Sequence, residues 1–268
     1  MCFSVVIPLY NKELSIKATI QSVLNQSYQD FEIIVINDGS TDNSAEVVKE
    51  LNEPRIRLIH QVNQGVSAAR NKGIAVATFE WIAFLDGDDI WFPTHLSEIN
   101  KMIIRYPESK VFSTSFEYSD NRKLFKHKRD SDVFEVNNYF KEAIKEKLMW
   151  TSVVVINKSC FITTPAFNEK LNRGEDLDLW ARLAKEYTFV KNKEVTAIYY
   201  VDDISSLSNG RSTFNKSILS TIELKNKVGS ERKYFKRLLV KRLKTDLKTL
   251  NIFEIIKIII KHNFQLLI

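Results

Sequence analysis

The stretch FEIIVINDGSTD, residues 31–42, indicates the fold more clearly than any other part of this sequence. Its first six residues, FEIIVI, form a continuous run that is rich in β-branched side chains and has the length of one strand. Such a run is typical of a parallel strand that is buried on both faces of a sheet. The NDGSTD that follows contains the residue types of a tight turn leading into a helix. We therefore expect a buried parallel strand at residues 31–36.

The same alternation extends over the first 120 residues, where short apolar runs are separated by helix-like segments. Ser15 is a candidate cap of the first helix, and further helices are expected near 45–51, 65–77 and 93–106. The alternation predicts an α/β fold, in which a mostly parallel sheet carries helices on both faces. Further apolar runs predict strands at 4–7, 56–60, 81–85, 111–118, 150–156 and 196–201. A helix is expected at 175–186, and the sequence beyond residue 212 has an almost wholly helical pattern.

The net charge of +6 is unevenly distributed along the 268 residues. Residues 231–268 contain ten Lys or Arg and three Asp or Glu, a net of +7, so the first 230 residues sum to −1. An anionic partner is therefore expected at the C-terminal segment. The two cysteines, Cys2 and Cys160, indicate free thiols in a reducing compartment. The sequence also lacks a secretory signal and a long apolar window, so we expect a cytoplasmic location.

Three turns follow strands of the predicted sheet, and ligands of such sheets bind outside the carboxyl ends of the strands. The turns are residues 8–10 (PLY), 37–39 (NDG) and 86–89 (DGDD). Closely spaced carboxylates such as Asp86 and Asp88 repel one another, and a divalent cation with a preference for oxygen ligands relieves that repulsion. A solvated acidic turn is the alternative explanation for DGDD alone.

Two further segments contain candidate site residues. Arg70 lies in GVSAARN (65–71), whose small residues allow a helix to pack closely on the sheet, and it is placed to reach a phosphate or an acid. Glu175 and Asp176 open the predicted helix at 175–186, where acids are also favoured simply by the helix dipole. For Arg70 the alternative is an ordinary surface arginine on a helix. For Glu175 and Asp176 the functional interpretation is a general base, and the alternative is helix capping.

Taken together, five ordered segments resemble the family 2 glycosyltransferases, which have the A-type (GT-A) fold with a Rossmann-like sheet. The resemblance covers about residues 3–205. It rests on VVIPLYN (5–11), INDGSTDNS (36–44), NQGVSAARNKG (63–73), FLDGDD (84–89) and GEDLDLW (174–180). It implies a catalytic domain at 1–210, with a nucleotide-binding half to about 118 and an acceptor half from about 119. Residues 211–268 would form a helical extension.

The resemblance also implies roles for single residues. Pro8 and Tyr10 match residues that pack near the nucleotide base, and Asp38 matches the acid that hydrogen-bonds it. Arg70 matches the arginine near the base and phosphates. The remaining matches are to the donor and cation carboxylates, Asp86 and Asp88, and to the catalytic base, Asp176, with Glu175 beside it.

The function implied is an inverting transfer of a sugar from a nucleotide sugar, typically UDP-linked, to an acceptor hydroxyl, with Mn²⁺ or Mg²⁺ as the cofactor. The setting expected from the family is bacterial surface polysaccharide synthesis on a glycan or lipid-linked acceptor. A sugar-nucleotide nucleotidyltransferase is the alternative enzyme, but the PLYNKE segment lacks the glycine-rich loop that it should contain. The alternative without catalysis is a scaffold that binds nucleotide or membrane, which loss of the acids would favour.

The sequence departs from the family pattern after residue 200. Asp202 and Asp203 stand where a basic residue would meet the diphosphate, and Arg211 is the candidate substitute. The C-terminal segment interleaves Lys and Arg with apolar residues at helical spacing. This pattern indicates either peripheral binding to the anionic inner face of a membrane or packing on the catalytic domain or a second subunit as a homodimer. Nucleic-acid binding is not expected, because no nucleic-acid motif accompanies the charge.

Overall fold

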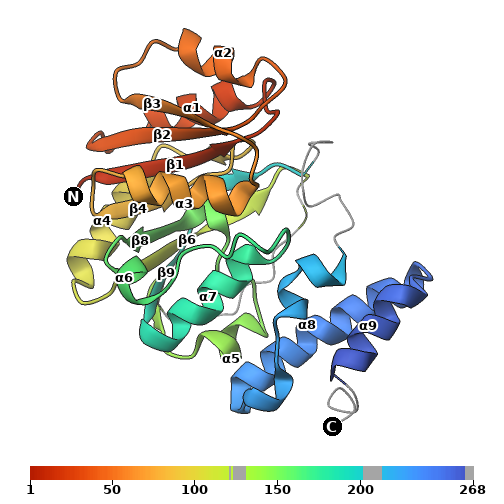
Figure 1. Cartoon of the computed structure of the whole chain (residues 1–268). Helices are drawn as coiled ribbons and strands as arrows, with labels where there is room; N and C mark the ends of the chain where they lie inside the picture. Colours follow the sequence, from red (N-terminus) through yellow and green to blue (C-terminus); the bar gives the residue numbers. More distant parts are fainter. Residues whose placement is uncertain (121, 123–130, 202–212, 263–268) are drawn as a thin grey trace.

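The protein is described by a computed structural model covering residues 1–120, 122, 131–201 and 213–262 (Figure 1). The described residues form a nine-stranded sheet in the order β3-β2-β1-β4-β8-β6-β9-β5, with β7 paired to β9. The strands are β1 (Phe3–Leu9), β2 (Phe31–Asp38), β3 (Ile56–Gln61), β4 (Trp81–Phe84), β5 (Ile90–Trp91), β6 (Val111–Tyr118), β7 (Val133–Val136), β8 (Val154–Asn157) and β9 (Phe189–Tyr199). The longer helices are α1 (Ile16–Leu24), α2 (Ser44–Glu50), α3 (Val66–Val76), α4 (His95–Arg105), α7 (Glu175–Glu186), α8 (Gly229–Lys248) and α9 (Ile252–His262).

The first half of the sheet is parallel, as the sequence predicts. β1 pairs in parallel with β2 and β4, and β2 pairs in parallel with β3. Every residue of β2 is buried, which confirms the strand expected at 31–36. Alternate side chains enter two separate cores, one on each face, because successive residues of a strand point to opposite sides. Val5 and Ile7 pack with α1 and α4, whereas Val6 packs with α3 and α7.

The second half of the sheet is mixed. β8 is antiparallel to both β4 and β6, and β6 is parallel to β9. β8 lies between β4 and β6 and is antiparallel to both, so β6 and its parallel partner β9 run in the same direction as β4. The carboxyl ends of β1, β2, β4, β6 and β9 therefore meet at one rim. The expected strand at 150–156 begins later, at Val154, because residues 151–153 form the 3-10 turn η1 (Thr151–Val153). The strand expected at 196–201 begins earlier, at Phe189, since the charged KNKE stretch hides its apolar pattern.

Close packing between α3 and β1 explains the small residues of the 65–73 segment. A Cβ on Gly73 would lie 2.3 Å from the Cγ1 of Val6, so only glycine fits without movement of the strand. Figure 1 shows α3 lying across the sheet face that α7 also covers.

The C-terminal extension is helical in its described part, as expected, and it shares a hydrophobic core with the sheet and α7. Three short 3-10 turns, η3 (Phe214–Lys216), η4 (Ile218–Ser220) and η5 (Leu224–Asn226), lead into α8 and α9. Phe214, Ile218 and Leu239 join the same hydrophobic cluster as Leu179 and Trp180 of α7. No helix among the described residues is long and apolar enough to cross a membrane.

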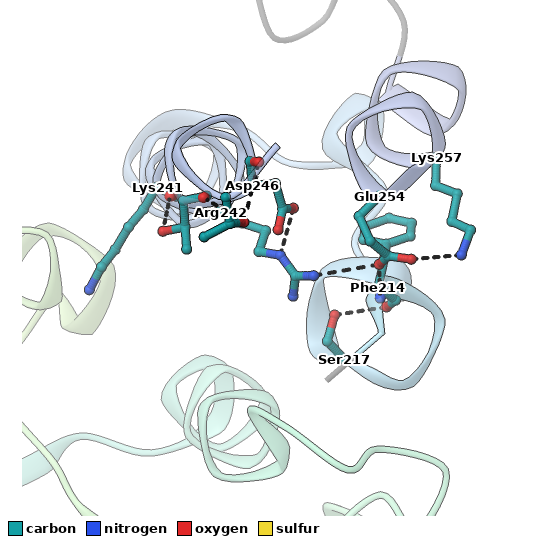
Figure 2. Close-up of polar contacts among 9 residues, drawn as sticks. Phe214, Ser217, Lys241, Arg242, Asp246, Glu254 and Lys257 are labelled. Atoms are coloured by element: carbon teal, nitrogen blue, oxygen red, sulfur yellow. Dashed lines mark hydrogen bonds and ion pairs between the residues drawn. The ribbon is translucent and has the colours of Figure 1, made fainter. Parts of the chain in front are cut away.

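Helix α9 is attached to the preceding residues through Glu254, and it exposes several apolar side chains. Glu254 is buried and accepts hydrogen bonds from the Phe214 backbone N–H and the Lys257 ammonium, the latter at 2.7 Å (Figure 2). Arg242 of α8 lies 3.5 Å from Glu254 and also pairs with Asp246 at 2.7 Å. We call these five residues the polar anchor of α9. The opposite face of the helix exposes large apolar side chains: Ile252, Phe253, Ile256, Ile259 and Ile260.

Candidate active site

The rim at the strand ends brings together most of the residues that the sequence singles out. The turn after β4 lies against the end of β1, because a Cβ on Gly87 would come within 3.1 Å of the Pro8 carbonyl oxygen. Ser15 occupies the position before α1, but its side chain makes no capping bond to the helix. Its hydroxyl instead donates to the Gly87 carbonyl at 2.9 Å. Ser15 therefore joins the start of α1 to the acidic turn.

Arg70 connects three elements at the centre of this rim. One guanidinium nitrogen lies 2.6 Å from an oxygen of Asp86, and another lies 3.0 Å from an oxygen of Glu175. The ring of Phe167 lies under the guanidinium at 5.1 Å. Arg70 is only 3% exposed, and both acids raise its pKa against the opposing effect of burial. Of the two partners that the sequence allows, phosphate or acid, the structure shows acids, one from the turn after β4 and one from the start of α7.

Asp88 is bound by a cation from the protein itself. The Lys12 ammonium, on the loop after β1, lies 2.7 Å from an Asp88 oxygen, and both side chains are largely buried. The sequence offers no indication of this pair, because the two residues are 76 positions apart and Lys12 lies in an ordinary polar turn. The contact shows that a positive charge fits against Asp88 at this rim.

Asp89, the last acid of the turn, is a buried structural residue. Its carboxylate accepts hydrogen bonds from the Ser152 hydroxyl at 2.7 Å and from the Tyr200 backbone N–H at 3.2 Å. Burial and the neighbouring charges of Asp88 and Asp86 raise its pKa well above the ordinary value. Ser152 also accepts a hydrogen bond from the Asp86 N–H at 3.1 Å. Ser152 thus positions the acidic turn, although in sequence it is one polar residue within an apolar run.

Asp38 ends β2 and organises the turn that leads into α3. It is 3% exposed and accepts three hydrogen bonds: from the side-chain amide of Gln61 and from the backbone N–H groups of Gln64 and Gly65, at 2.8 to 2.9 Å. A carboxylate offers about four acceptor positions, so one position is left for a ligand. Tyr10, next to it in the rim after β1, is half exposed.

Asp176 lies at the start of α7, where the chain makes a turn that requires glycine. Gly174 has φ +75°, and a Cβ there would come within 2.6 Å of the Ile218 side chain. The residue that leaves no room for a side chain at position 174 is therefore Ile218 of η4. Asp176 accepts a hydrogen bond from the Leu177 N–H at 2.7 Å. Burial and the charge of Glu175 raise the pKa of Asp176 to about 6, against the opposing effects of Leu177, Lys147 and Arg70.

The described residues contain no group of three or more His, Cys, Asp or Glu side chains arranged to hold a metal ion. Asp86 and Asp88, which the resemblance assigns to the cation, are each paired with a basic side chain of the protein, Arg70 and Lys12 respectively. Asp202, Asp203 and Arg211, which the sequence analysis associates with the diphosphate, lie outside the described residues.

Comparisons with known proteins show the family to which the chain belongs. A family model described as glycosyl transferase family 2 matches residues 4–171, well over half of the chain. The chain is 34% identical to an uncharacterized glycosyltransferase of Rickettsia bellii over 185 residues, which are 68% of this chain and 26% of that protein. It is 32% identical to the glycosyltransferase GlyA of Streptococcus pneumoniae over 150 residues, which are 55% of this chain and 22% of GlyA. The chain therefore spans about a quarter of these curated relatives.

Solved structures share the fold. TarS residues 1–349 of S. aureus in complex with UDP-GlcNAc superpose with a TM-score of 0.68 at 19% identity, over 80% of this chain and 62% of TarS. The mannosyltransferase PcManGT of Pyrobaculum calidifontis in complex with GDP-Man and Mn²⁺ gives a TM-score of 0.60 at 17% identity, over 76% of this chain and 58% of PcManGT. These likenesses confirm the GT-A fold expected from the sequence.

Replacing Arg70 by methionine tests the central ion cluster. The change keeps the apolar stem but leaves the carboxylates of Asp86 and Glu175 without their counter-charge. Removing one partner of a buried ion pair typically costs about 3–5 kcal/mol. We expect Arg70→Met to lower the free energy of unfolding by that order, measured by denaturant titration at neutral pH. Lys72→Met, on the exposed side of α3, is the matched control, and an equal effect of both changes would contradict the assignment.

Proposed function

This chain belongs to glycosyl transferase family 2, and on that premise we propose that it transfers a sugar from a nucleotide sugar to an acceptor hydroxyl with inversion. The observation that carries the proposal is that the acids at one rim have different partners and environments. Arg70 fixes Asp86 and Glu175, and the Lys12 ammonium pairs with Asp88. Asp176 has a raised pKa. A donor side and a proton-accepting side are the two requirements of a single in-line displacement.

The donor is proposed to lie over the ends of β1 and β2. Tyr10 and Pro8 would pack near the nucleotide base, and Asp38 would accept a hydrogen bond from it through its remaining acceptor position. We propose a UDP-linked donor, from the match of Asp38 to the family's base-binding acid. The fold neighbours include one protein bound to UDP-GlcNAc and one bound to GDP-Man, so the experiment has to compare both nucleotides.

Asp86 and Asp88 are proposed to hold Mn²⁺ or Mg²⁺. These ions commonly take one or two carboxylates together with phosphate oxygens of the substrate, which suits a rim that offers two acids rather than three. The Lys12 ammonium lies 2.7 Å from Asp88, and we propose that the ion takes its place as the counter-charge of this carboxylate when the donor binds. When bound, the ion would stabilise the negative charge that develops on the diphosphate leaving group.

Asp176 is proposed as the general base that takes the proton of the acceptor hydroxyl. A base works best with a pKa near the working pH, and burial beside Glu175 moves the pKa of Asp176 in that direction. Glu175 would act through Arg70, because their ion pair fixes the start of α7 against the acidic turn. The two adjacent acids would thus have different roles, one chemical and one positional.

The exposed apolar face of α9 is proposed to lie on the anionic inner face of a membrane. The polar anchor turns Glu254 inward and leaves Phe253 82% exposed and Ile260 69% exposed. Five basic residues are exposed along α8 at spacings of three and four, and anionic lipids attract such charge: Lys233, Arg237, Lys241, Lys244 and Lys248. This placement suits a glycan or lipid-linked acceptor in surface polysaccharide synthesis. A homodimer through the same face is the competing proposal.

The donor and metal assignments can be tested by ligand-induced thermal stabilisation. We expect UDP to raise the melting temperature more in the presence of Mn²⁺ than in its absence, because ligands that bind only the folded state stabilise it. Asp88→Asn should remove the Mn²⁺-dependent part, whereas Glu46→Gln on the exposed face of α2 should not. If GDP but no uridine nucleotide stabilised the protein with Mn²⁺ present, the donor class proposed here would be wrong.

The role of Asp176 predicts a specific loss of transfer. We expect Asp176→Asn to bind the donor nucleotide as the unmodified protein does but to lose about 10²–10⁴-fold in transfer rate, the usual contribution of a general base. Because the ionised carboxylate is the active form, the transfer rate of the unmodified protein should fall about tenfold per pH unit below about pH 6. Near-normal transfer by Asp176→Asn, measured by release of the free nucleotide, would refute the assignment.

The membrane proposal predicts lipid-dependent sedimentation. The protein should sediment with vesicles containing phosphatidylglycerol and much less with pure phosphatidylcholine vesicles. The double change Phe253→Ser and Ile260→Ser should abolish sedimentation, and the control Ile104→Ser, on α4, should not. A concentration-dependent dimer that dissociates in the double variant, with no vesicle binding by either protein, would favour the homodimer.

A further inference from the structure

Lys147 lies outside every role described above, and its ammonium group lies among four aromatic rings. The ammonium is 5.0 Å from the centroid of Phe116, 5.6 Å from that of Tyr199 and 5.9 Å from those of Tyr118 and Trp150. Each ring also contacts the next around a closed circuit, with centroid distances between 4.7 and 5.4 Å. We call these four rings the aromatic box. A cation within about 6 Å of such rings is attracted to their faces.

Two hydrogen-bonded segments connect the aromatic box to the acidic turn. Trp150 directly precedes η1, whose Ser152 bonds to the N–H of Asp86 and to the carboxylate of Asp89. Tyr199 directly precedes Tyr200, whose N–H donates to Asp89 at 3.2 Å. The box therefore belongs to the same rim as the proposed donor and metal acids.

The position of the box along that rim is on the acceptor side. Asp38 ends β2, Asp86 follows β4, and the rings of Phe116 and Tyr199 belong to β6 and β9. In the sheet order, β8 and then β6 and β9 follow β4 on the side away from β2. A donor that extends from Asp38 to Asp86 thus leaves the box for the group beyond the transferred sugar.

The charge of Lys147 is available to a ligand. Its ammonium makes no hydrogen bond or ion pair with any described residue, although it has three donors. Lys147 is exposed as a residue, but desolvation of its ammonium against the rings lowers its pKa, while the charges of Asp176 and Asp89 favour the protonated form. These two acids are the proposed base and the structural acid of the turn. The Lys147 ammonium therefore interacts favourably, through its charge, with the group that would receive the acceptor's proton.

We propose that the aromatic box and Lys147 form the acceptor subsite, and that this subsite takes a saccharide with an anionic substituent, a carboxylate or a phosphate. Tyr118 and Tyr199, the partly exposed rings of the box, would stack on the apolar C–H face of the sugar, with the buried Phe116 and Trp150 behind them, and the ammonium would pair with the sugar's negative charge. This proposal rests on the proposed function, since it assumes that Asp176 faces the acceptor. It adds a substrate class that the sequence patterns leave open.

Binding of three matched probes tests the subsite without relying on catalysis. Methyl glucoside, methyl glucuronide and glucose 6-phosphate would be titrated against the full chain by saturation-transfer difference NMR, with UDP and Mn²⁺ present. We expect at least one charged probe to bind about tenfold more tightly than the neutral one, the effect of one charge-assisted hydrogen bond. Which charged probe is preferred distinguishes a carboxylate from a phosphate.

Variants then assign the preference to Lys147. Lys147→Gln should remove the preference for the charged probe, Lys147→Arg should retain most of it, and Lys145→Gln, an exposed lysine two positions away, should leave it unchanged. Equal binding of charged and neutral probes, no binding of any probe, or an unchanged preference in Lys147→Gln would overturn the proposal. A loss of UDP stabilisation in Lys147→Gln would also overturn it, because Lys147 would then contact the donor. UDP stabilisation of the unmodified protein reports on the proposed function separately.

Discussion

The buried guanidinium of Arg70 is the interaction on which the rest of the site depends. It is the physical connection between the parallel half of the sheet, where the proposed donor acids lie, and α7, where the proposed base lies. Neither Asp86 nor Glu175 could be brought so far from water as carboxylates without a counter-charge. One side chain therefore fixes the spacing between the two sides of the proposed reaction, and the small residues of α3 allow it to reach that position.

The acids of the rim show how environment, rather than residue type, separates their roles. Asp86 is paired with an arginine, Asp88 with a lysine, and Asp89 is buried under hydrogen bonds from a serine and a backbone amide. Asp176 accepts a hydrogen bond from the Leu177 N–H, while burial and the like charge of Glu175 raise its pKa. A short acidic motif thus contains one buried structural residue and two residues that face the proposed ligands.

The sequence predicts the parts of this structure that depend on local patterns. The buried run at 31–36, the turns at the strand ends and the limits of α7 all follow from periodicity and turn chemistry, and the structure confirms them. Contacts between distant segments could not be predicted, because periodicity shows which face of an element is buried but not what covers it. Such contacts join Lys12 to Asp88, Ser152 to the acidic turn, and Lys147 to the aromatic box. The antiparallel direction of β8 could not be predicted for a related reason, since a short buried run has the same pattern in either direction.

The contact between Gly174 and Ile218 connects the C-terminal extension directly to the turn before Asp176. The turn before Asp176 has room for nothing larger than a hydrogen atom where η4 presses on it. The adjacent residues Arg173 and Ser217 are also bridged through their backbones. A partner that displaces η4 when it engages α8 and α9 would therefore also displace the turn before the base. Binding of a partner to the extension and binding of an acceptor at the rim would then be thermodynamically linked, and by reciprocity a bound acceptor would alter the affinity of the extension for its partner.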